Sequence, residues 1–164
     1  MSKRTPEVVD LFRRLRTEDP EAFLSSEPDL TAVNDRGRSL LQEAIASRKL
    51  DLAAELVKRK IDLNIQDESG STALHYAAAH DAQALAEQII AAGADPNLHD
   101  RYGNGALWAF AFAAKDDYTV VRLLIEHGAD PAHVNRAGKS VLDLARQFKS
   151  AELWRLCGGN PDDF

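Results

Sequence analysis

The chain has 164 residues, of which 45% are hydrophobic and 28% are charged, a composition close to that of soluble globular domains and unlike that of disordered or fibrous chains. Its net charge is −6, and the deficit lies in the second half, because residues 1–66 hold twelve basic and twelve acidic side chains whereas residues 67–164 hold eight and fourteen. An acidic balance argues against nucleic acid as the partner, since phosphates require clustered Lys and Arg. It agrees with a basic protein partner, and equally with a surface charge that only keeps the chain in solution.

The sequence also indicates in which cellular compartment the protein is expected. It has no run of eighteen apolar residues, and its first residues, MSKRTPEVVDLFRRLR, lack the apolar stretch of a secretion signal. Cys157 is the single cysteine and cannot form an internal disulfide, which agrees with a reducing compartment. We therefore expect a cytoplasmic protein without a membrane segment, in which Cys157 acts as a small hydrophobic side chain.

An internal repeat organises the sequence from residue 37 onward. Gly37, Gly70 and Gly103 are spaced by 33 residues, and Gly138 follows after 35. A leucine stands four residues after each of these glycines, and paired apolar residues precede KID, GAD and GAD in the first three copies. A repeat of this length is a unit of two elements that cannot bury its apolar face alone, so several copies predict a stacked solenoid.

The second copy, DESGSTALHYAAAHDAQALAEQIIAAGADPN at residues 67–97, resembles the ankyrin repeat closely, through G-x-T-x-L-H-x-A-A, a second apolar helix and GAD. Thr72 is placed to cap the first helix, and Gly93 to take the left-handed conformation that ends the second. Lys60 replaces that glycine in the preceding copy, and Gly105 replaces the capping threonine in the following copy. The resemblance implies an all-α ankyrin-repeat solenoid of about five helix pairs joined by β-hairpin-like loops.

The resemblance extends over residues 1–164 as a single domain. Its expected parts are an N-terminal capping repeat at 5–33, full repeats at 34–66, 67–99 and 100–134, a C-terminal capping repeat at 135–159 and a polar tail at 160–164. Counting back one repeat aligns Val8 and Leu11 with inward-facing positions of the later copies. The third full repeat is two residues longer, which predicts an enlarged exposed turn around Lys115, Asp116, Asp117 and Tyr118.

The stretch GALWAFAFAA, residues 105–114, alternates Trp108, Phe110 and Phe112, which in isolation is the period of a strand. The repeat frame assigns it to a first helix, where Trp108 and Phe112 are four residues apart and share a face. Phe110 then takes the inward position that alanine fills in three of the four copies, so we expect it in the core. The ankyrin resemblance implies that Phe112 is exposed on the concave face, where the family's first helices lie. Trp108 could either wedge between repeats or contact a partner.

Motifs for catalysis and cofactor binding are absent from the sequence, which has no Gly-rich phosphate loop, no nucleophile elbow and no H-E-x-x-H. We predict no cofactor, no metal and no enzymatic activity. The alternative is a metal-dependent enzyme built on His75, His80 and Asp81, although His75 and His80 are five residues apart on one helix and so diverge. In the ankyrin family a histidine at the position of His75 hydrogen-bonds the next hairpin. Asp116 and Asp117 are expected to belong to a solvated turn.

Recognition of a protein is the remaining function. Ankyrin proteins bind partners through the hairpin tips and the first helices. Carried over position by position, the candidate partner-binding residues are Arg36, Arg38, Glu68, Ser69, His80, Arg101, Tyr102, Asn104, Trp108, Phe112, Arg136 and Lys139. Arg101, Tyr102, Trp108 and Phe112 bring into one repeat the residue types that are enriched in binding hot spots.

The resemblance therefore predicts a non-enzymatic module, monomeric when free, that inhibits or sequesters a protein partner. Small ankyrin proteins of bacterial character are often similar to immunity proteins that neutralise a toxin. The acidic second half would complement a basic toxin or effector, such as a nuclease. An adaptor or scaffold subunit of a larger complex is the alternative.

Overall fold

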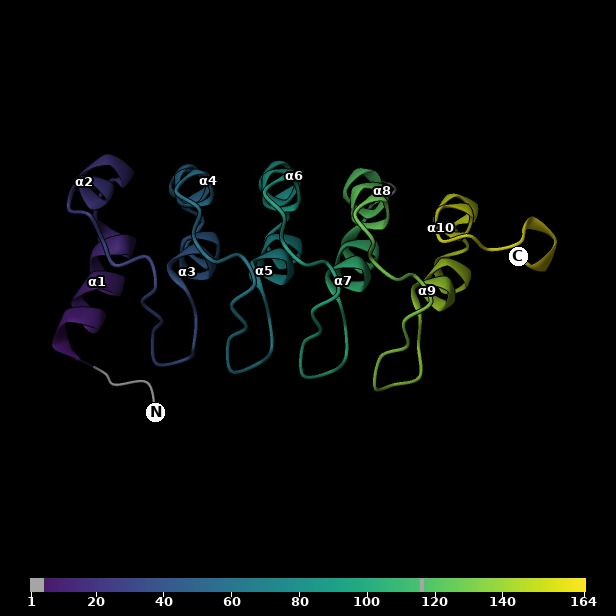
Figure 1. Ribbon diagram of the computed structural model, residues 1–164. Coiled ribbons are helices and arrows are strands. Elements are labelled where there is room, and N and C mark those ends of the chain that lie inside the picture. The colour runs from purple at the N-terminus through teal and green to yellow at the C-terminus, as the bar shows by residue number, and fades with distance from the viewer. Residues whose placement is uncertain (1–4, 116) are drawn as a thin grey trace.

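The computed structural model describes residues 5–115 and 117–164 of the chain, and they form a row of stacked helix pairs. The pairs are α1 (Pro6–Thr17) with α2 (Pro20–Ser25), α3 (Leu40–Ala46) with α4 (Leu50–Lys58), α5 (Ala73–Ala79) with α6 (Gln83–Ala91), α7 (Ala106–Ala113) with α8 (Thr119–Glu126), and α9 (Val141–Phe148) with α10 (Ala151–Leu156). Odd-numbered helices form one row and even-numbered helices a second, and hairpin-shaped loops project beyond the odd-numbered row (Figure 1). The expected all-α solenoid of five helix pairs is confirmed, while the repeat boundaries stay a prediction.

The first helices begin at capping side chains that also help to join neighbouring repeats. Ser39 and Gln42 form a capping box at the start of α3, and the Gln42 amide donates to the backbone oxygens of Ile65 and Ser71, on the two sides of the following hairpin. These bonds satisfy the free N–H groups of the helix start and hold the following hairpin at the same time.

His75 plays the corresponding part at the start of α5. Its Nδ1 accepts from the Thr72 backbone N–H at 3.2 Å, so Nε2 carries the proton. Nε2 donates to the backbone oxygen of Asn104 at 2.9 Å. The bond that the family resemblance implied for His75, to the next hairpin, is therefore present. Thr72 occupies the N-cap, as expected.

The second helices end in left-handed backbone. Gly93 has φ +92° directly after α6, and Gly128 has φ +88° after α8. Lys60 takes the same conformation after α4, at φ +58°, although it carries a side chain. The expected left-handed conformation of Gly93 is confirmed, and the solenoid accepts a lysine at the equivalent place.

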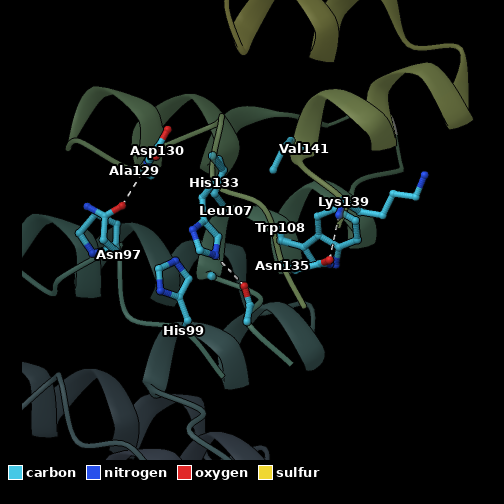
Figure 2. A pocket seen from close by; sticks show the side chains of 13 residues that line it. Asn97, His99, Leu107, Trp108, Ala129, Asp130, His133, Asn135, Lys139 and Val141 are labelled. Atoms are coloured by element: carbon cyan, nitrogen blue, oxygen red, sulfur yellow. Dashed lines mark hydrogen bonds between the residues drawn. The ribbon is translucent and has the colours of Figure 1, made fainter. Parts of the chain in front are cut away.

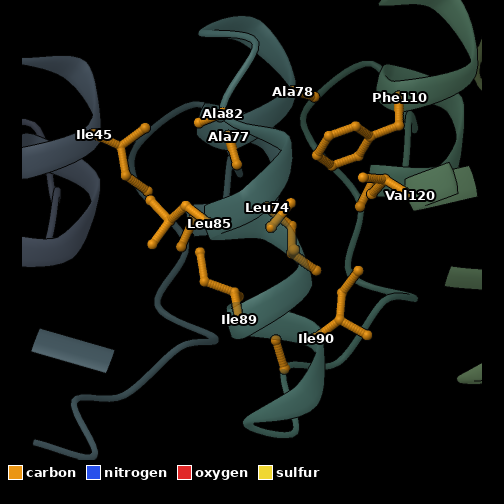
Figure 3. Packing of buried hydrophobic residues seen from close by; sticks show 14 of the residues in the cluster. Ile45, Leu74, Ala77, Ala78, Ala82, Leu85, Ile89, Ile90, Phe110 and Val120 are labelled. Atoms are coloured by element: carbon orange, nitrogen blue, oxygen red, sulfur yellow. The ribbon is translucent and has the colours of Figure 1, made fainter. Parts of the chain in front are cut away.

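The core is a continuous layer between the two rows of helices. Leu74 and Ala77 of α5 lie against Leu85 and Ile89 of α6, and all four side chains are buried (Figure 3). Phe110 is also buried and lies beside Ala78 and Val120 (Figure 3). The expectation that Phe110 belongs to the core is confirmed.

Backbone hydrogen bonds join neighbouring hairpin tips. We call the tips at residues 35–38, 68–71, 101–104 and 136–139 the tip edge. The bonds run from Glu68 N to the Arg36 oxygen at 2.9 Å, from Arg101 N to the Ser69 oxygen at 2.8 Å, and from Arg136 N to the Tyr102 oxygen at 2.9 Å. Each tip therefore has a fixed position relative to the next one.

The enlarged loop of the third full repeat differs in part from the expectation. Five residues, 114–118, separate α7 from α8, compared with three, 80–82, between α5 and α6, so the longer turn is confirmed. Asp116 lies outside the described residues. Tyr118 is buried, however, and its hydroxyl donates to Ser150 Oγ of the last repeat at 2.9 Å.

The two ends of the solenoid also depart from the repeat frame. Phe12 and Leu15 are the buried residues of α1, whereas Val8 and Leu11 are only partly buried, because α1 is five residues longer than α3 and has a neighbour on one side only. At the other end, Trp154 Nε1 donates to the backbone oxygen of Asn160 at 2.7 Å. The Phe164 ring packs on the Trp154 ring, with ring centres 5.7 Å apart. The expected polar tail thus covers an aromatic side chain of α10.

Candidate protein-binding surface

The candidate tip residues all lie along the tip edge, where their exposure divides them into two groups. Arg36, Glu68, Arg101, Tyr102, Arg136 and Lys139 are exposed, whereas Arg38, Ser69 and Asn104 are partly buried. The backbone bonds between the tips hold both groups in one row. The structure therefore brings the tip residues together on one edge of the solenoid.

Arg101 and Tyr102 form an exposed stacked pair on the third tip. The Arg101 guanidinium carbon lies 4.9 Å from the centre of the Tyr102 ring, and Nη2 donates to the Tyr102 hydroxyl at 2.9 Å. The Tyr102 side chain remains 56% exposed. This contact orders two side chains of the types enriched in hot spots before any partner arrives.

A groove lies between the first and second tips and α5, next to Arg101. Arg38 lies over the ring of Tyr76 at 5.1 Å, and the Tyr76 hydroxyl donates to Asp67 Oδ2 at 2.7 Å. Burial and the bond to the Asp67 carboxylate raise the pKa of Tyr76 to about 12. Burial acts to raise the pKa of Asp67 as well, but hydrogen bonds from Ser69, Tyr76 and Ser71 outweigh it, and that pKa is lowered.

The last turns of α7 and α9 present an exposed aromatic pair. Phe112 is 60% exposed, as expected, and its ring centre lies 6.0 Å from that of Phe148, which is 42% exposed. The candidate residues chosen from the sequence did not include Phe148. Phe112 stands nine residues after Gly103 and Phe148 stands ten residues after Gly138, so counting from these glycines places the two rings near equivalent helix ends.

Trp108 lies at the junction between α7 and the last repeat. It is half-buried, packs against the core, and lines a shallow pocket together with Lys139 and Val141 (Figure 2). It takes the helix position at which His75 bonds the next hairpin, and instead fills the junction by packing. The wedge interpretation is therefore supported by the geometry, and a contact with a partner stays a prediction.

Two stacked histidines form another wall of this pocket (Figure 2). The ring centres of His99 and His133 are 3.7 Å apart, and His133 Nε2 lies 2.8 Å from the Gly103 oxygen. Burial, followed by the neighbouring His133 and His75, lowers the pKa of His99. These rings stack against each other in a structural contact between hairpins.

The residues considered for an enzymatic site do not converge. His75 is bonded to Thr72 and Asn104, whereas the His80 ring stacks on Tyr76 with ring centres 6.4 Å apart. Among residues 5–115 and 117–164, no group of three or more His, Cys, Asp and Glu is arranged to hold a metal ion. Cys157 is buried, and burial raises the pKa of its thiol to about 11.

The stacked pairs with hairpins projecting from one row define a repeat solenoid. A family model described as ankyrin repeats in three copies matches residues 10–100, and one described as ankyrin repeat matches residues 102–136. These matches span more than half of the chain, so the protein belongs to the ankyrin repeat family and is a protein-interaction module. Residues 137–164 lie outside both matches. No curated protein matches the chain.

In the described residues, no helix has both the length and the apolar character needed to cross a membrane.

Proposed function

We propose that this protein is a non-enzymatic cytoplasmic module that binds one protein partner through the tip edge and the adjoining face of the first helices. The observation that carries the proposal is the exposure of Tyr102 and Phe112 on neighbouring parts of one repeat. Large exposed aromatic side chains are unfavourable in water, and a partner's surface is the environment that would cover them. The Arg101 stack on Tyr102 adds a charged, ordered group to the same surface.

We further propose that binding inhibits or sequesters the partner, as an immunity protein does with a toxin. A repeat solenoid acts most directly by covering the surface that its partner needs. An adaptor role would instead leave the partner's activity unchanged while a second protein binds elsewhere on the solenoid. An assay of the partner's activity with and without equimolar ankyrin protein distinguishes the two roles.

The test of the binding surface is the double change Tyr102→Ala with Phe112→Ala. Both side chains are largely exposed, so the melting temperature should stay nearly constant. Affinity for a partner recovered from the source cells should fall by about 2 kcal/mol or more, which is roughly a 30-fold rise in Kd measured by calorimetry.

Val9→Ala is the matched control, because Val9 is also an exposed apolar side chain but lies on α1, whose helix pair contributes no hairpin to the tip edge. It should leave Kd unchanged. Retention of full affinity by the double variant would remove these aromatics from the interface, and a large fall in its melting temperature would show that they stabilise the fold instead.

A further inference from the structure

We propose that the groove between the first two hairpin tips binds carboxylate side chains of an acidic segment of the protein partner. The inference rests on the proposed protein-binding function and specifies the charge of the partner. The groove is lined by Arg36, Arg38, Glu68, Tyr76 and Arg101, together with Asp67 and Ser69. Its arginines come from the first and third tips, on either side of the second.

The tip edge differs in charge from the chain as a whole. The tips carry five basic side chains, Arg36, Arg38, Arg101, Arg136 and Lys139, and two acidic ones, Asp35 and Glu68, whereas the full chain has a net charge of −6. The expectation of a basic partner depended on the net charge of the second half. Local charge decides which surface meets which partner, and the local charge of the tip edge favours an acidic one.

Two arginines of the groove are available for a partner. Among the described residues, neither Arg36 nor Arg101 has a carboxylate oxygen within 4.0 Å. The side-chain bond of Arg101 goes to the neutral Tyr102 hydroxyl, which leaves its charge unneutralised. Exposed arginines with open donors suit bidentate contacts with carboxylates.

The third arginine is held in place but incompletely bonded. Arg38 has a side chain that is 23% exposed, and its contacts with Glu43 and Asp67 are long, at 3.6 and 4.0 Å. Its buried Nε has no hydrogen-bond partner in the described residues. Glu43 also accepts from Arg16 at 2.9 Å, so its charge is shared between two arginines. Arg38 therefore adds positive potential to the groove that its neighbours only partly offset.

The two acidic side chains of the groove, Asp67 and Glu68, differ in their hydrogen bonds and exposure. Asp67 is occupied, because its two oxygens accept bonds from Ser69, Ser71 and Tyr76. Glu68 is exposed and lies on the tip between Arg36 and Arg101. A bound carboxylate would be repelled by Glu68 and attracted by the arginines on both sides. This arrangement gives the proposal a signed test, since removal of opposite charges must have opposite effects.

An acidic peptide fits this surface better than a nucleic acid. A row of phosphates gains affinity in proportion to the cations it meets, and here Glu68 interrupts the row. The net charge of −6 would also repel a long polyanion, whereas a short segment with two or three carboxylates meets mainly the local arginines.

The experiment is a fluorescence anisotropy titration of the full chain with a fluorescein-labelled peptide of alternating glutamate and serine. The same peptide with glutamine for glutamate, and a labelled oligothymidylate, serve as comparison probes. At low ionic strength the glutamate peptide should bind, and the glutamine peptide should not. Arg36→Gln with Arg101→Gln should weaken glutamate-peptide binding by roughly fivefold to tenfold, and Glu68→Gln should strengthen it by about threefold.

The charge-matched control is Lys58→Gln with Arg155→Gln, which removes two exposed cations away from the tip edge. It should leave peptide binding almost unchanged, and circular dichroism melts should show all variants folded. An equal loss in the control would mean that net charge governs binding and would overturn the proposal. So would an absence of any gain from Glu68→Gln, or binding of the oligothymidylate in place of the peptide.

Failure of this inference can be told apart from failure of the proposed function. The peptide could fail to bind while Tyr102→Ala with Phe112→Ala still lowers affinity for the recovered partner. That result would support the proposed protein-binding surface and reject the proposal that the partner's segment is acidic. If both experiments fail, the tip edge is not the interface.

Discussion

The second and third full repeats use the same frame in different ways. The pair α5–α6 has His75 bonded to the next hairpin, alanines facing its neighbours and a three-residue turn. The pair α7–α8 has Trp108 at the histidine position, Phe110 at an alanine position and a five-residue turn. Both stack on their neighbours, so the solenoid depends on burial at each junction more than on the particular side chain that achieves it.

The bond that Trp108 cannot make is replaced from the other side of the junction. His133 Nε2 contacts the Gly103 oxygen, and Asn135 Nδ2 donates to Asn104 Oδ1 at 2.8 Å. In the second repeat, His75 of the first helix bonds to the hairpin that follows it. In the third repeat, His133 and Asn135 of the following hairpin bond to the tip that precedes them. The third repeat also has aromatic side chains that the stack does not bury, and Phe112 is the clearest of them.

The largest effect is expected at Phe110, where the third repeat has a ring in place of the second repeat's Ala77. Replacement of Phe110 by Ala removes a buried ring beside Ala78 and Val120, and should lower the free energy of unfolding by about 3 to 5 kcal/mol through the cavity it leaves. Urea denaturation measures this loss. Ala77→Phe at the equivalent place should also destabilise, by overpacking, since only the third repeat has adjusted to a ring. A gain in stability from Ala77→Phe would contradict the idea that each junction is fitted to its own side chain.

A smaller effect is expected at the helix ends, where the repeats agree. Gly93→Val forces a β-branched residue to φ +92° and should cost about 1 to 2 kcal/mol, although an added Cβ at Gly93 would have no atom within 4 Å. Lys60→Gly should be neutral or stabilising, because Lys60 already holds a left-handed conformation at φ +58°. Urea melts of both variants test the alignment, and equal destabilisation by the two changes would refute it.

The smallest effect concerns pH and the stacked pair of His99 and His133. The pKa of His99 is lowered from its usual 6.5 in the folded state, so below pH 6.5 the unfolded chain binds more protons. This part of the stability is present above pH 6.5 and is lost as the pH falls through the folded pKa. His99→Gln should therefore flatten the decline in unfolding free energy between pH 7.5 and 5.5. An unchanged slope would assign the decline to other groups.

The repeat frame explains which parts of the structure could be predicted from the sequence. The left-handed Gly93 and the burial of Phe110 follow from comparing one copy with another, whereas the bond from His75 and the exposure of Phe112 follow from the resemblance to ankyrin repeats. Each copy meets the same neighbours, so equivalent residues meet equivalent environments. The exposed tip residues follow for the same reason.

The features that escaped prediction lie where the repeat changes in length or ends. Tyr118 lies in a loop longer than its counterparts, and Phe12 is buried on a terminal helix that is longer than the others. The contact of Phe164 with Trp154 forms beyond the last repeat, where the tail covers a ring that would otherwise face water. In these places the surrounding side chains, and not the frame, decide what is buried. The arginine groove escaped for a different reason, because its charge arises from three tips that were considered one at a time.

The backbone bonds along the tip edge have a mechanical consequence. One bond joins each pair of neighbouring tips, so the bonds act in series when the two ends of the solenoid are pulled apart, and each must fail on its own. Among the described residues, the junction between α1–α2 and α3–α4 has no bond of this kind. Besides its apolar packing, it has hydrogen bonds from the side chains of Arg16, Lys49 and Arg59 to Glu43 and to the backbone oxygens of Glu18 and Leu24. Under tension the first helix pair should therefore peel away before the others, while the remaining tips keep their spacing.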